Sequence, residues 1–445
     1  MRFYFQKIWQ LSWPIIIGQM SYVLMGIADN IMVGKVNAAS VATVGVCNSI
    51  FFTVTIIGIG IFSILPPLIS KSKAEEDYAK CGYLLNNGVL ISLWLGVLLM
   101  GITIFLAGNF TWFAQEESVN ELAPGFLRLL GYSAIPMFVF LAAKQFTDGL
   151  GFTRESMLLA MGAVVLNIIL NYILIYGHFG FAPMGALGAG WATFISRIFM
   201  GIGILVFIFK SRKTKPFRPD NLWHNNTKHH REILKDGIPS GFQYFFEIAA
   251  FSVANIFMGM INKEASAAHQ IVISFAALTY LFVSGIGIGG SIMVSESLGE
   301  KNKRNAYLYG INAIRMAFVI EIFTCLLFII FQRSIPLLYI ENEAVLHYAI
   351  PLMLIAAVFQ IPDGIQCVSL GVLRGIYDVR WPTVFTLLAY WGVALPLSYY
   401  LGFVAGWGAQ GIWWGLTIGL IASALLLFFR FYYIARPEAE SGDSV

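Results

Sequence analysis

The sequence predicts an all-α polytopic membrane protein with twelve transmembrane helices in two six-helix bundles, related by a pseudo-two-fold axis along the membrane normal. Its composition is the first reason: 58% of the 445 residues are hydrophobic, 12% are charged, and the mean hydropathy is +0.75. A soluble chain of this length needs more polar surface than these values allow. The second reason is that apolar stretches of about 18 or more residues recur from end to end, which is typical of membrane-spanning helices.

The apolar stretches form two sets of six. They lie at roughly 8–34, 45–70, 83–107, 125–150, 156–177, 186–209, 235–260, 269–296, 307–331, 346–372, 381–403 and 411–434. The longest polar stretch, at 210–236, separates the sixth from the seventh. We therefore expect an N-terminal six-helix lobe, a basic linker, a C-terminal six-helix lobe and a tail, at 1–209, 210–234, 235–436 and 437–445.

The basic residues predict the orientation of the chain. If both termini are cytoplasmic, most of the 28 Lys and Arg residues fall in cytoplasmic segments, and the loops on the opposite side hold only Lys35, Lys263 and Arg333. Basic residues concentrate on the cytoplasmic side of multi-pass proteins. We therefore expect both termini and the linker to be cytoplasmic. This distribution also explains the net charge of +4, so we expect no nucleic-acid partner.

The two halves resemble each other weakly. Shifted by 226 positions, TDGLGFTR at 147–154 lies over LRGIYDVR at 373–380, and shifted by 225, Asn37 meets Asn262. Because each half has six spans, both halves start on the same side of the membrane, and the repeats are parallel. Transporters built from such repeats hold their substrate between the two halves.

Acidic residues inside the spans are the candidate functional residues. Asp29, Glu247, Glu321 and Asp363 lie within apolar stretches, where an isolated charge costs roughly 2.5–3.5 kcal/mol. Such residues usually face a cavity or a partner, so we expect functional roles for Asp29, Glu247 and Asp363. The alternative is a salt bridge or a protonated acid that helps helices to pack. Glu321 sits in the apolar stretch MAFVIEIFTCLLF without a polar stripe, and a structural or lipid-boundary role fits it as well as a functional one.

Helical spacing places polar side chains beside two of these acids. They are Gln243, Tyr244 and Asn255 around Glu247, and Gln360 and Gln366 around Asp363. Pro362 lacks a backbone N–H, which frees the carbonyl of Val358 to accept from water or bind a cation. Oxygen ligands suit Na⁺, for which Glu247 and Asp363 would be the metal ligands, and a desolvated carboxylate suits a proton equally well.

Two further groups of polar residues lie inside the N-terminal lobe. Asn167 and Asn171, four positions apart, either line this lobe or bond to a neighbouring helix. Lys144 and Asp148, also four apart, are expected to form an internal ion pair. Arg197 is expected to be structural as well.

Three weaker patterns carry less information. GIGIGG at 285–290 lies inside a span and indicates close helix packing. His224, His229 and His230 lie in the polar linker and are expected to be solvated. Ser, His and Asp are never grouped as nucleophilic catalysis requires, so we do not expect an enzyme.

Four segments of the chain are distinctive: ADNIMVGKVNAASVATVG, FFEIAAFSVANIFMG, AAHQIVISF and LRGIYD. With them the chain resembles, over nearly its whole length, the multidrug and toxic compound extrusion (MATE) family, and in particular its NorM-type branch. The resemblance implies the MATE fold. It also matches Asp29, Glu247 and Asp363 to the family's acids of the first, seventh and tenth helices, the last two belonging to the cation-coupling site of the NorM-type C-terminal lobe. By the same resemblance His269 and Gln270, which begin the eighth helix, are candidate cavity-lining residues.

The resemblance implies a function. A member of this family would be a monomeric inner-membrane antiporter that exports amphipathic, often cationic drugs and dyes by alternating access, with Na⁺ or H⁺ as coupling ion and no other cofactor. The alternative is a lipid-linked oligosaccharide flippase of the same superfamily, which should have a basic cavity, whereas the deepest charges here are mostly acidic. The sequence leaves the coupling ion open.

Overall fold

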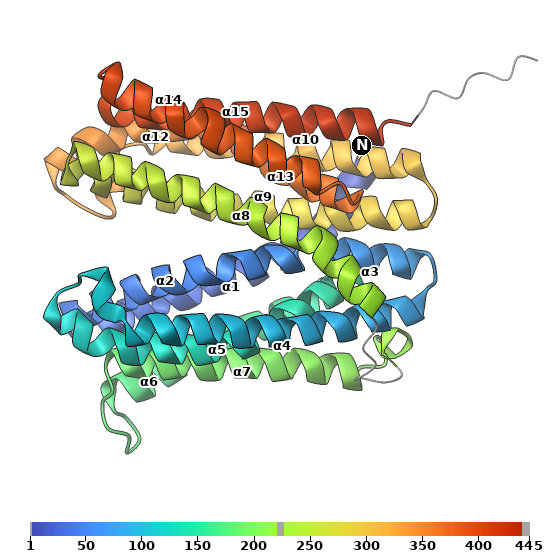
Figure 1. Cartoon of the computed structure of the whole chain (residues 1–445), viewed down its shortest axis with the longest axis horizontal. Helices are drawn as coiled ribbons and strands as arrows, with labels where there is room; N and C mark the ends of the chain where they lie inside the picture. The colour runs from blue at the N-terminus through green and yellow to red at the C-terminus, as the bar shows by residue number, and fades with distance from the viewer. Residues whose placement is uncertain (1, 220–226, 438–445) are drawn as a thin grey trace, which may run out of the picture. The chain divides into compact units, whose positions relative to one another are not determined.

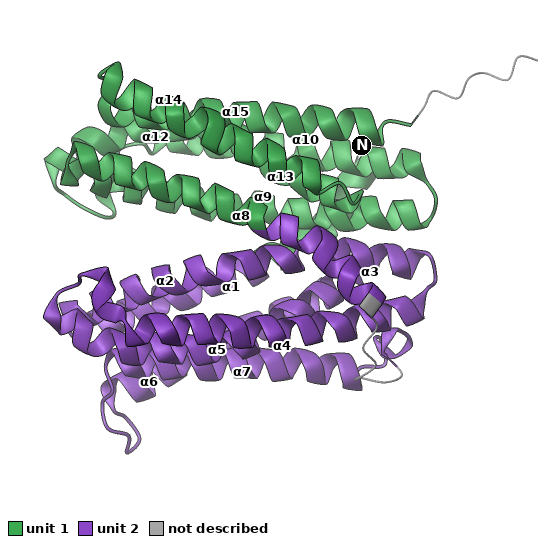
Figure 2. Ribbon diagram, viewed as in Figure 1, with its two compact units in different colours: residues 1–16, 242–445 green, residues 17–241 purple. Residues whose placement is uncertain are grey.

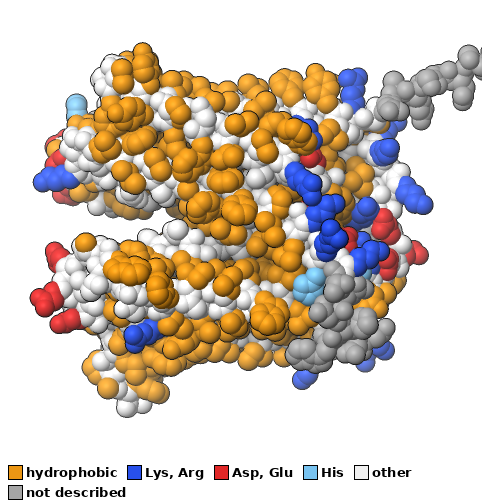
Figure 3. All heavy atoms as spheres, in the orientation of Figure 1, with side chains coloured by type: hydrophobic (Ala, Val, Ile, Leu, Met, Phe, Trp, Pro, Cys, Tyr) orange, Lys and Arg blue, Asp and Glu red, His pale blue; other side chains and the backbone are white. Residues whose placement is uncertain are grey.

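The computed structural model of the chain describes residues 2–219 and 227–437, which are almost entirely helical and contain no β-strand (Figure 1). Twelve helical stretches are long and apolar enough to cross a membrane. The predicted all-α polytopic membrane fold with twelve spans is therefore confirmed. Figure 3 shows hydrophobic side chains along the middle of the helices and charged side chains gathered toward the helix ends.

The spans follow one another with short connections. The first six are α1 (Arg2–Gly34), α2 with α3 (Ala38–Phe62 and Leu65–Ala74), α4 (Tyr78–Gly108), α5 (Glu117–Gly149), α6 (Thr153–Tyr176) and α7 (Ala186–Lys210). The second six are α8 (Thr227–Ile261), α9 (Lys263–Gly299), α10 (Lys303–Ile330), α12 (Glu343–Gly375), the composite α13–η3–α14–η4 (Arg380–Val404) and α15 (Gly408–Ala435). Three short helices, η1 (Phe110–Phe113), η2 (Lys215–Phe217) and α11 (Ser334–Leu337), lie in the connections.

The helix ends repeat along the chain. Asn37 begins the stretch formed by α2 and α3, Asn262 begins α9, and both stretches are 37 residues long. Each of these asparagines accepts a hydrogen bond from the backbone N–H three residues ahead, which is the usual N-cap interaction. The 33-residue helices α5 and α12 end at Gly149 and Gly375, which differ by the predicted shift of 226. The same local structure is therefore built twice.

Left-handed backbone conformations recur in the same register. Glu76 follows α3 with a φ of 59°, and Lys301 follows α9 with a φ of 60°. Gly151 follows α5 with a φ of 89°, and the matching position after α12 is Tyr377, with a φ of 62°. A residue other than glycine adopts this conformation at a cost of roughly 1–2 kcal/mol. Three of the four residues are not glycine, so both copies form these turns despite that cost.

Contacts between helices divide the chain into two units (Figure 2). The N-lobe unit is Ile17–Gly241, and the C-lobe unit is Met1–Ile16 with Phe242–Val445. The sequence predicted lobe boundaries at 209 and 235 instead. The difference arises because α1 and α8 are continuous helices that each begin in one unit and end in the other. Hydropathy marks where a helix ends, not where its packing partners change.

Each crossing follows a proline. Pro14 precedes the crossing in α1 and Pro239 precedes the crossing in α8, and both prolines lie inside their helices. On its C-lobe side, α1 is held to α10 by Tyr4, whose hydroxyl donates to Asn305 at 3.2 Å. The ring of Tyr4 also packs edge-on against Tyr309, with the centroids 4.8 Å apart.

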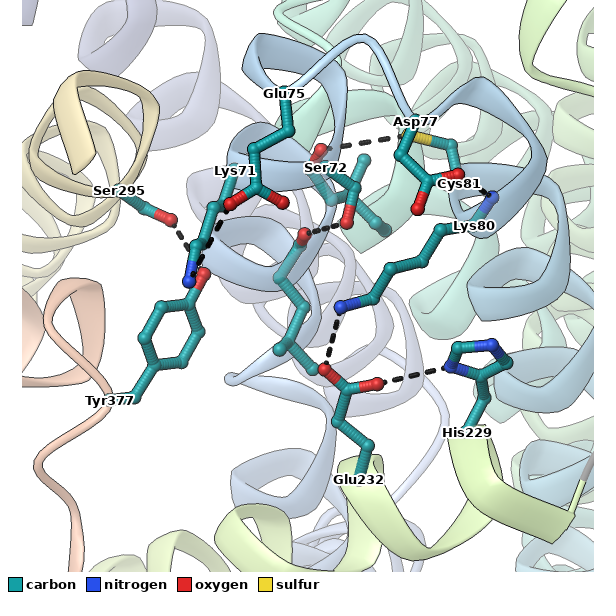
Figure 4. A network of polar contacts seen from close by, with 12 residues as sticks. Lys71, Ser72, Glu75, Asp77, Lys80, Cys81, His229, Glu232, Ser295 and Tyr377 are labelled. Carbon is teal, nitrogen blue, oxygen red and sulfur yellow. Dashed lines mark hydrogen bonds and ion pairs between the residues drawn. The ribbon is translucent and has the colours of Figure 1, made fainter. Parts of the chain in front are cut away.

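Part of the predicted linker is helical, because α8 begins at Thr227. Glu232 on this first part of α8 accepts from Nζ of Lys80 at 2.9 Å, and Nδ1 of His229 lies 3.0 Å from its other carboxylate oxygen (Figure 4). The imidazole of His229 also stacks on the ring of Tyr83. His229 is 8% exposed, so the expectation that it is solvated is wrong. These contacts make the polar start of α8 part of the N-lobe unit.

Some sequence-based expectations lie outside the described residues. They concern the linker segment 220–226, with His224, and the tail from 438 onward. The expectation for GIGIGG at 285–290 is confirmed, because a Cβ on Gly371 of α12 would collide with the carbonyl oxygen of Gly287 on α9. Glycine at this position thus allows two helix backbones to touch.

Candidate functional site

Asp29 on α1 is the centre of a buried hydrogen-bond cluster in the N-lobe unit. Asn171 on α6 donates to one of its carboxylate oxygens at 2.6 Å, and Thr193 on α7 donates to the other at 2.9 Å. Asn171 also donates to Asn167 at 3.1 Å, and Asn167 donates to Thr193 at 3.4 Å. We call these four residues the Asp29 cluster. None is more than 5% exposed, so the carboxylate is solvated by protein donors in place of water.

The sequence left open whether the two asparagines line the lobe or bond to another helix. The structure shows that Asn171 joins α6 to α1. Thr193 was missed, because a single threonine in an apolar helix carries little signal. Arg197, one turn further along α7, donates to Ser133. Its charge acts on Asp29, but the two form no ion pair within the described chain.

A second buried pair in the N-lobe unit is closed on itself. Nζ of Lys144 lies 2.5 Å from Asp148, and the two side chains are 5% and 0% exposed. The hydroxyl of Ser156 donates to the other carboxylate oxygen at 2.8 Å. The predicted internal pair is therefore confirmed. Both charges therefore already have partners within the protein.

Glu247 lines a small cavity in the C-lobe unit. The cavity has a volume of about 10 Å³ and lies among α8, α9 and α12. Tyr244, Tyr280, Cys367 and Arg374 are among the other residues that line it. We call it the Glu247 cavity. A space of this size holds about one water molecule or one small cation.

Asp363 lies near this cavity on α12 and is 5% exposed. The charges of Glu247 and Glu321 both act on it through space. Within the described part of the chain, neither Glu247 nor Asp363 forms an ion pair with Lys, Arg or His. The C-lobe unit therefore holds a buried acid, Asp363, and a partly buried acid, Glu247, that have no direct basic partner. Such acids are destabilising unless something else neutralises them.

An irregular helix contributes to this region. The eleventh span contains two π-helical segments, η3 (Leu388–Ala394) and η4 (Tyr400–Val404). Segment η3 carries Tyr390, which is fully buried. The hydroxyl of Tyr390 donates to Gln366 at 3.0 Å, and it also lies near Glu247. Segments of this kind often occur at functional sites, because the extra residue redirects a side chain. The next residue, Trp391, donates to the carbonyl of Phe246 on α8 at 3.1 Å.

The predicted lining residues do not all gather at this site. Tyr244 lines the Glu247 cavity, Gln243 accepts from Arg374 at 3.2 Å, and Gln366 accepts from Tyr390. Gln360 is fully buried one turn before Asp363 and donates to Thr279 on α9.

The remaining three predicted lining residues lie elsewhere. Asn255, two turns beyond Glu247 on α8, accepts from Ser266 at 3.4 Å. His269 is 2% exposed and accepts at Nδ1 from Nε1 of Trp413 at 3.1 Å, inside the hydrophobic core. Gln270 is exposed on the surface of its helix. His269 thus lies in the core and Gln270 on the surface, and neither lines the Glu247 cavity.

Glu321 is the acid whose role the sequence left open. It is 1% exposed, and its Cγ atom occupies the space that a Cβ on Gly364 would need. The side chain therefore packs against the α12 backbone beside Asp363, and its Oε2 atom has no hydrogen-bond partner. The available signal was the glycine directly after Asp363, which makes room for a side chain from another helix.

Comparisons with known proteins agree with this architecture. The family model MatE matches residues 14–173 and 239–400, once in each half of the chain. The chain belongs to the MATE family. The multidrug resistance protein NorM of Photobacterium profundum is 30% identical over 436 residues, which is 97% of this chain and 95% of that protein. The probable multidrug resistance protein NorM of Bacillus cereus is 32% identical over 434 residues, covering 96% and 94%.

Solved MATE structures share the fold. The crystal structure of the eukaryotic MATE transporter AtDTX14 matches with a TM-score of 0.89 and covers 96% of this chain and 95% of that one. Its sequence identity is 19%, so this likeness concerns the fold. The MATE fold that the sequence resemblance implied is thus confirmed.

Proposed function

We propose that this MATE-family chain is a multidrug efflux antiporter that exports amphipathic, often cationic organic compounds in exchange for Na⁺ or H⁺. The observation that carries the proposal is the group of acids inside the membrane-spanning helices of the C-lobe unit. Glu247 and Asp363 lack an ion pair within the described chain, and Glu247 faces a cavity of the size of one ion or water molecule. The names of the NorM relatives support the class of substrate.

Glu247 and Asp363 act as the coupling pair. Two carboxylates that repel each other in a dry interior favour a state that admits water or a cation. Binding of a proton or Na⁺ removes this repulsion and favours the opposite facing of the protein. Because a ligand shifts an equilibrium only through its different affinities for two states, the ion and the drug must prefer opposite facings. This is alternating access.

The candidate residues also bear on the choice of ion. The described residues contain no group of three or more His, Cys, Asp or Glu side chains arranged to hold a metal ion. Na⁺ would therefore need neutral oxygens besides the carboxylates of Glu247 and Asp363, such as the carboxamide oxygen of Gln366 or the freed carbonyl of Val358. A proton needs only one carboxylate oxygen.

The rest of the proposal follows from the membrane topology. The protein lies in the inner membrane as a monomer, with both termini and the linker in the cytoplasm, and works without a cofactor beyond the coupling ion. It is a transporter and not an enzyme, and it does not bind nucleic acid. A flippase for lipid-linked oligosaccharides would need cations to hold pyrophosphate, which the buried acids of the C-lobe unit would oppose.

Dye export tests the proposal. The full chain is expressed in an efflux-deficient bacterial strain, and dye accumulation is compared for the parent, Glu247→Gln and Asp363→Asn. Glu343→Gln, which changes an exposed acid in the first turn of α12, is the matched control. We expect both site variants to lose most export at equal membrane abundance. Export by both variants at the parental rate would show that these acids do not couple transport.

The coupling ion is tested separately. Purified protein in proteoliposomes is given a Na⁺ gradient or a pH gradient, one at a time, and dye movement is followed. The gradient that drives dye movement identifies the ion.

A further inference from the structure

Arg374 is a buried cation beside the coupling acids, in the last turn of α12. It is 8% exposed and donates from Nη2 to the carboxamide oxygen of Gln243 at 3.2 Å and from Nη1 to the hydroxyl of Tyr244 at 3.4 Å. The centre of its guanidinium lies 5.0 Å from the centroid of the Tyr244 ring. Its Nε atom is buried and has no hydrogen-bond partner.

These contacts leave the guanidinium under-satisfied. Arginine is always charged and has five N–H donors, yet Arg374 has two long hydrogen bonds to neutral oxygens. Within the described residues it forms no ion pair. A buried charge without an opposite charge is strongly destabilising, so the position calls for an anion nearby.

Glu247 is the carboxylate that meets this requirement. It lies one turn from Gln243 and Tyr244 on α8, and it lines the same 10 Å³ cavity as Arg374. The charges of Arg374 and Glu247 attract each other across this cavity, although the two side chains are not in ion-pair contact. A water molecule in the cavity would bridge them. Glu247 therefore has a protein cation, Arg374, on the other side of its cavity. Asp363, in contrast, lies near two like charges, those of Glu247 and Glu321.

We propose that Arg374 is the resident counter-cation of Glu247, which the coupling ion must replace at this carboxylate in every cycle. This inference rests on the proposed function. In the ion-free site the guanidinium balances Glu247 across the cavity. An arriving ion then neutralises Glu247 in place of Arg374. Because the positive charge of Arg374 repels the ion, the ion binds more weakly and is able to leave again. An ion pathway needs binding that is favourable but weak enough for release.

The geometry explains why arginine fits this role. Its planar fork lies over the Tyr244 ring while it reaches Gln243, so the charge is held in place without occupying the cavity. Gln243 and Tyr244 are thus positioning residues for Arg374. The competing explanation is that Arg374 only ties α12 to α8, in which case its loss would lower stability and leave ion affinity unchanged.

The experiment measures ion affinity in the full chain. Cation-driven export of a cationic dye from proteoliposomes is recorded against the concentration of the driving ion, which gives the half-saturating concentration. The variants are Arg374→Gln, Glu247→Gln and the double variant. Arg380→Gln removes an exposed cation at the start of α13, the next helix, and serves as the control. Thermal unfolding is measured on the same preparations.

Removal of the resident cation has a defined signature. For Arg374→Gln we expect the half-saturating ion concentration to fall by at least about tenfold, because the positive charge that repels the arriving ion is gone. We expect the maximal rate to fall as well, because the ion is released more slowly. Arg380→Gln should match the parent. In the Glu247→Gln background, Arg374→Gln should have little further effect, because the carboxylate that both cations share is gone.

Three outcomes separate the explanations. A half-saturating concentration within twofold of the parent, with or without a lower unfolding temperature, overturns the role of Arg374 and leaves the proposed function intact. If dye export by the parent protein depends on neither Na⁺ nor H⁺, both the role of Arg374 and the proposed function are overturned. If Arg374→Gln does not reach the membrane, Gln243→Glu is used instead, because it gives the guanidinium of Arg374 a carboxylate partner other than Glu247. An unchanged ion affinity in Gln243→Glu also overturns the inference.

Discussion

The Asp29 cluster allows a double-mutant test of whether this buried acid carries a charge. Thr193→Val keeps the shape of the side chain and removes the hydroxyl that donates to Asp29 at 2.9 Å. A neutral hydrogen bond between membrane helices contributes about 0.6 kcal/mol on average, whereas a bond to a charged group contributes roughly 1.5–3 kcal/mol. The cost of Thr193→Val therefore reports the state of Asp29.

The magnitude follows from the remaining contacts. After the substitution Asp29 keeps the bond from Asn171 at 2.6 Å but loses the bond from Thr193 to its other oxygen. We expect Thr193→Val to lower the free energy of unfolding by about 2 kcal/mol, because an ionised carboxylate oxygen is left unsatisfied in a buried site. In the Asp29→Asn background we expect the cost to fall below about 1 kcal/mol.

The assay is reversible unfolding of the purified protein in detergent, for the parent, both single variants and the double variant. The coupling energy of this cycle should be at least about 1 kcal/mol. Ser49→Ala, which removes an exposed hydroxyl bonded within its own helix, is the control. A coupling energy near zero, or an equal cost of Thr193→Val in both backgrounds, would show that the reasoning about Asp29 is wrong.

Three further predictions concern stability and are checked by the same unfolding assay. Gly364→Ala should cost about 1–3 kcal/mol, because its Cβ would collide with Cγ of Glu321, and Glu321→Ala should relieve most of that cost. Lys144→Met should cost about 3–5 kcal/mol by leaving Asp148 buried and unpaired, and a smaller loss would mean that Asp148 is already neutral. Asn262→Ala should cost about 1 kcal/mol by removing the N-cap of α9, and no change would exclude a capping contribution.

Sequence patterns predicted the number and order of the helices well. Hydropathy identifies the apolar centre of each span, and the repeat fixes equivalent helix ends such as Gly149 and Gly375. Helix starts were less accurate, since the first turn of α5 at Glu117 is polar and lowers any hydropathy average. The change of unit inside α1 and α8 had no sequence signal, because an apolar helix can pack equally well against different neighbours.

The candidate site shows where such prediction stops. Single residues such as Asp29 and Asn171 were identified, but their 2.6 Å contact joins positions 142 residues apart, which helical spacing cannot reveal. Arg374 had no sequence signal as a site residue, because its burial against Tyr244 depends on how α12 meets α8. His269, a polar residue in an apolar helix, was expected to line a cavity. One hydrogen bond inside the core, from the indole N–H of Trp413 to Nδ1, meets the needs of its acceptor atom instead.

The prolines of α1 and α8 mark where these two helices bend most easily. A proline has no backbone N–H, so each of them removes one hydrogen bond of its helix just before the chain passes from one unit to the other. The two positions are equivalent in the duplicated halves. Bending therefore requires less energy at these two turns than along the rest of α1 and α8. Pro14 and Pro239 thus form a matched pair of weak points inside otherwise continuous helices.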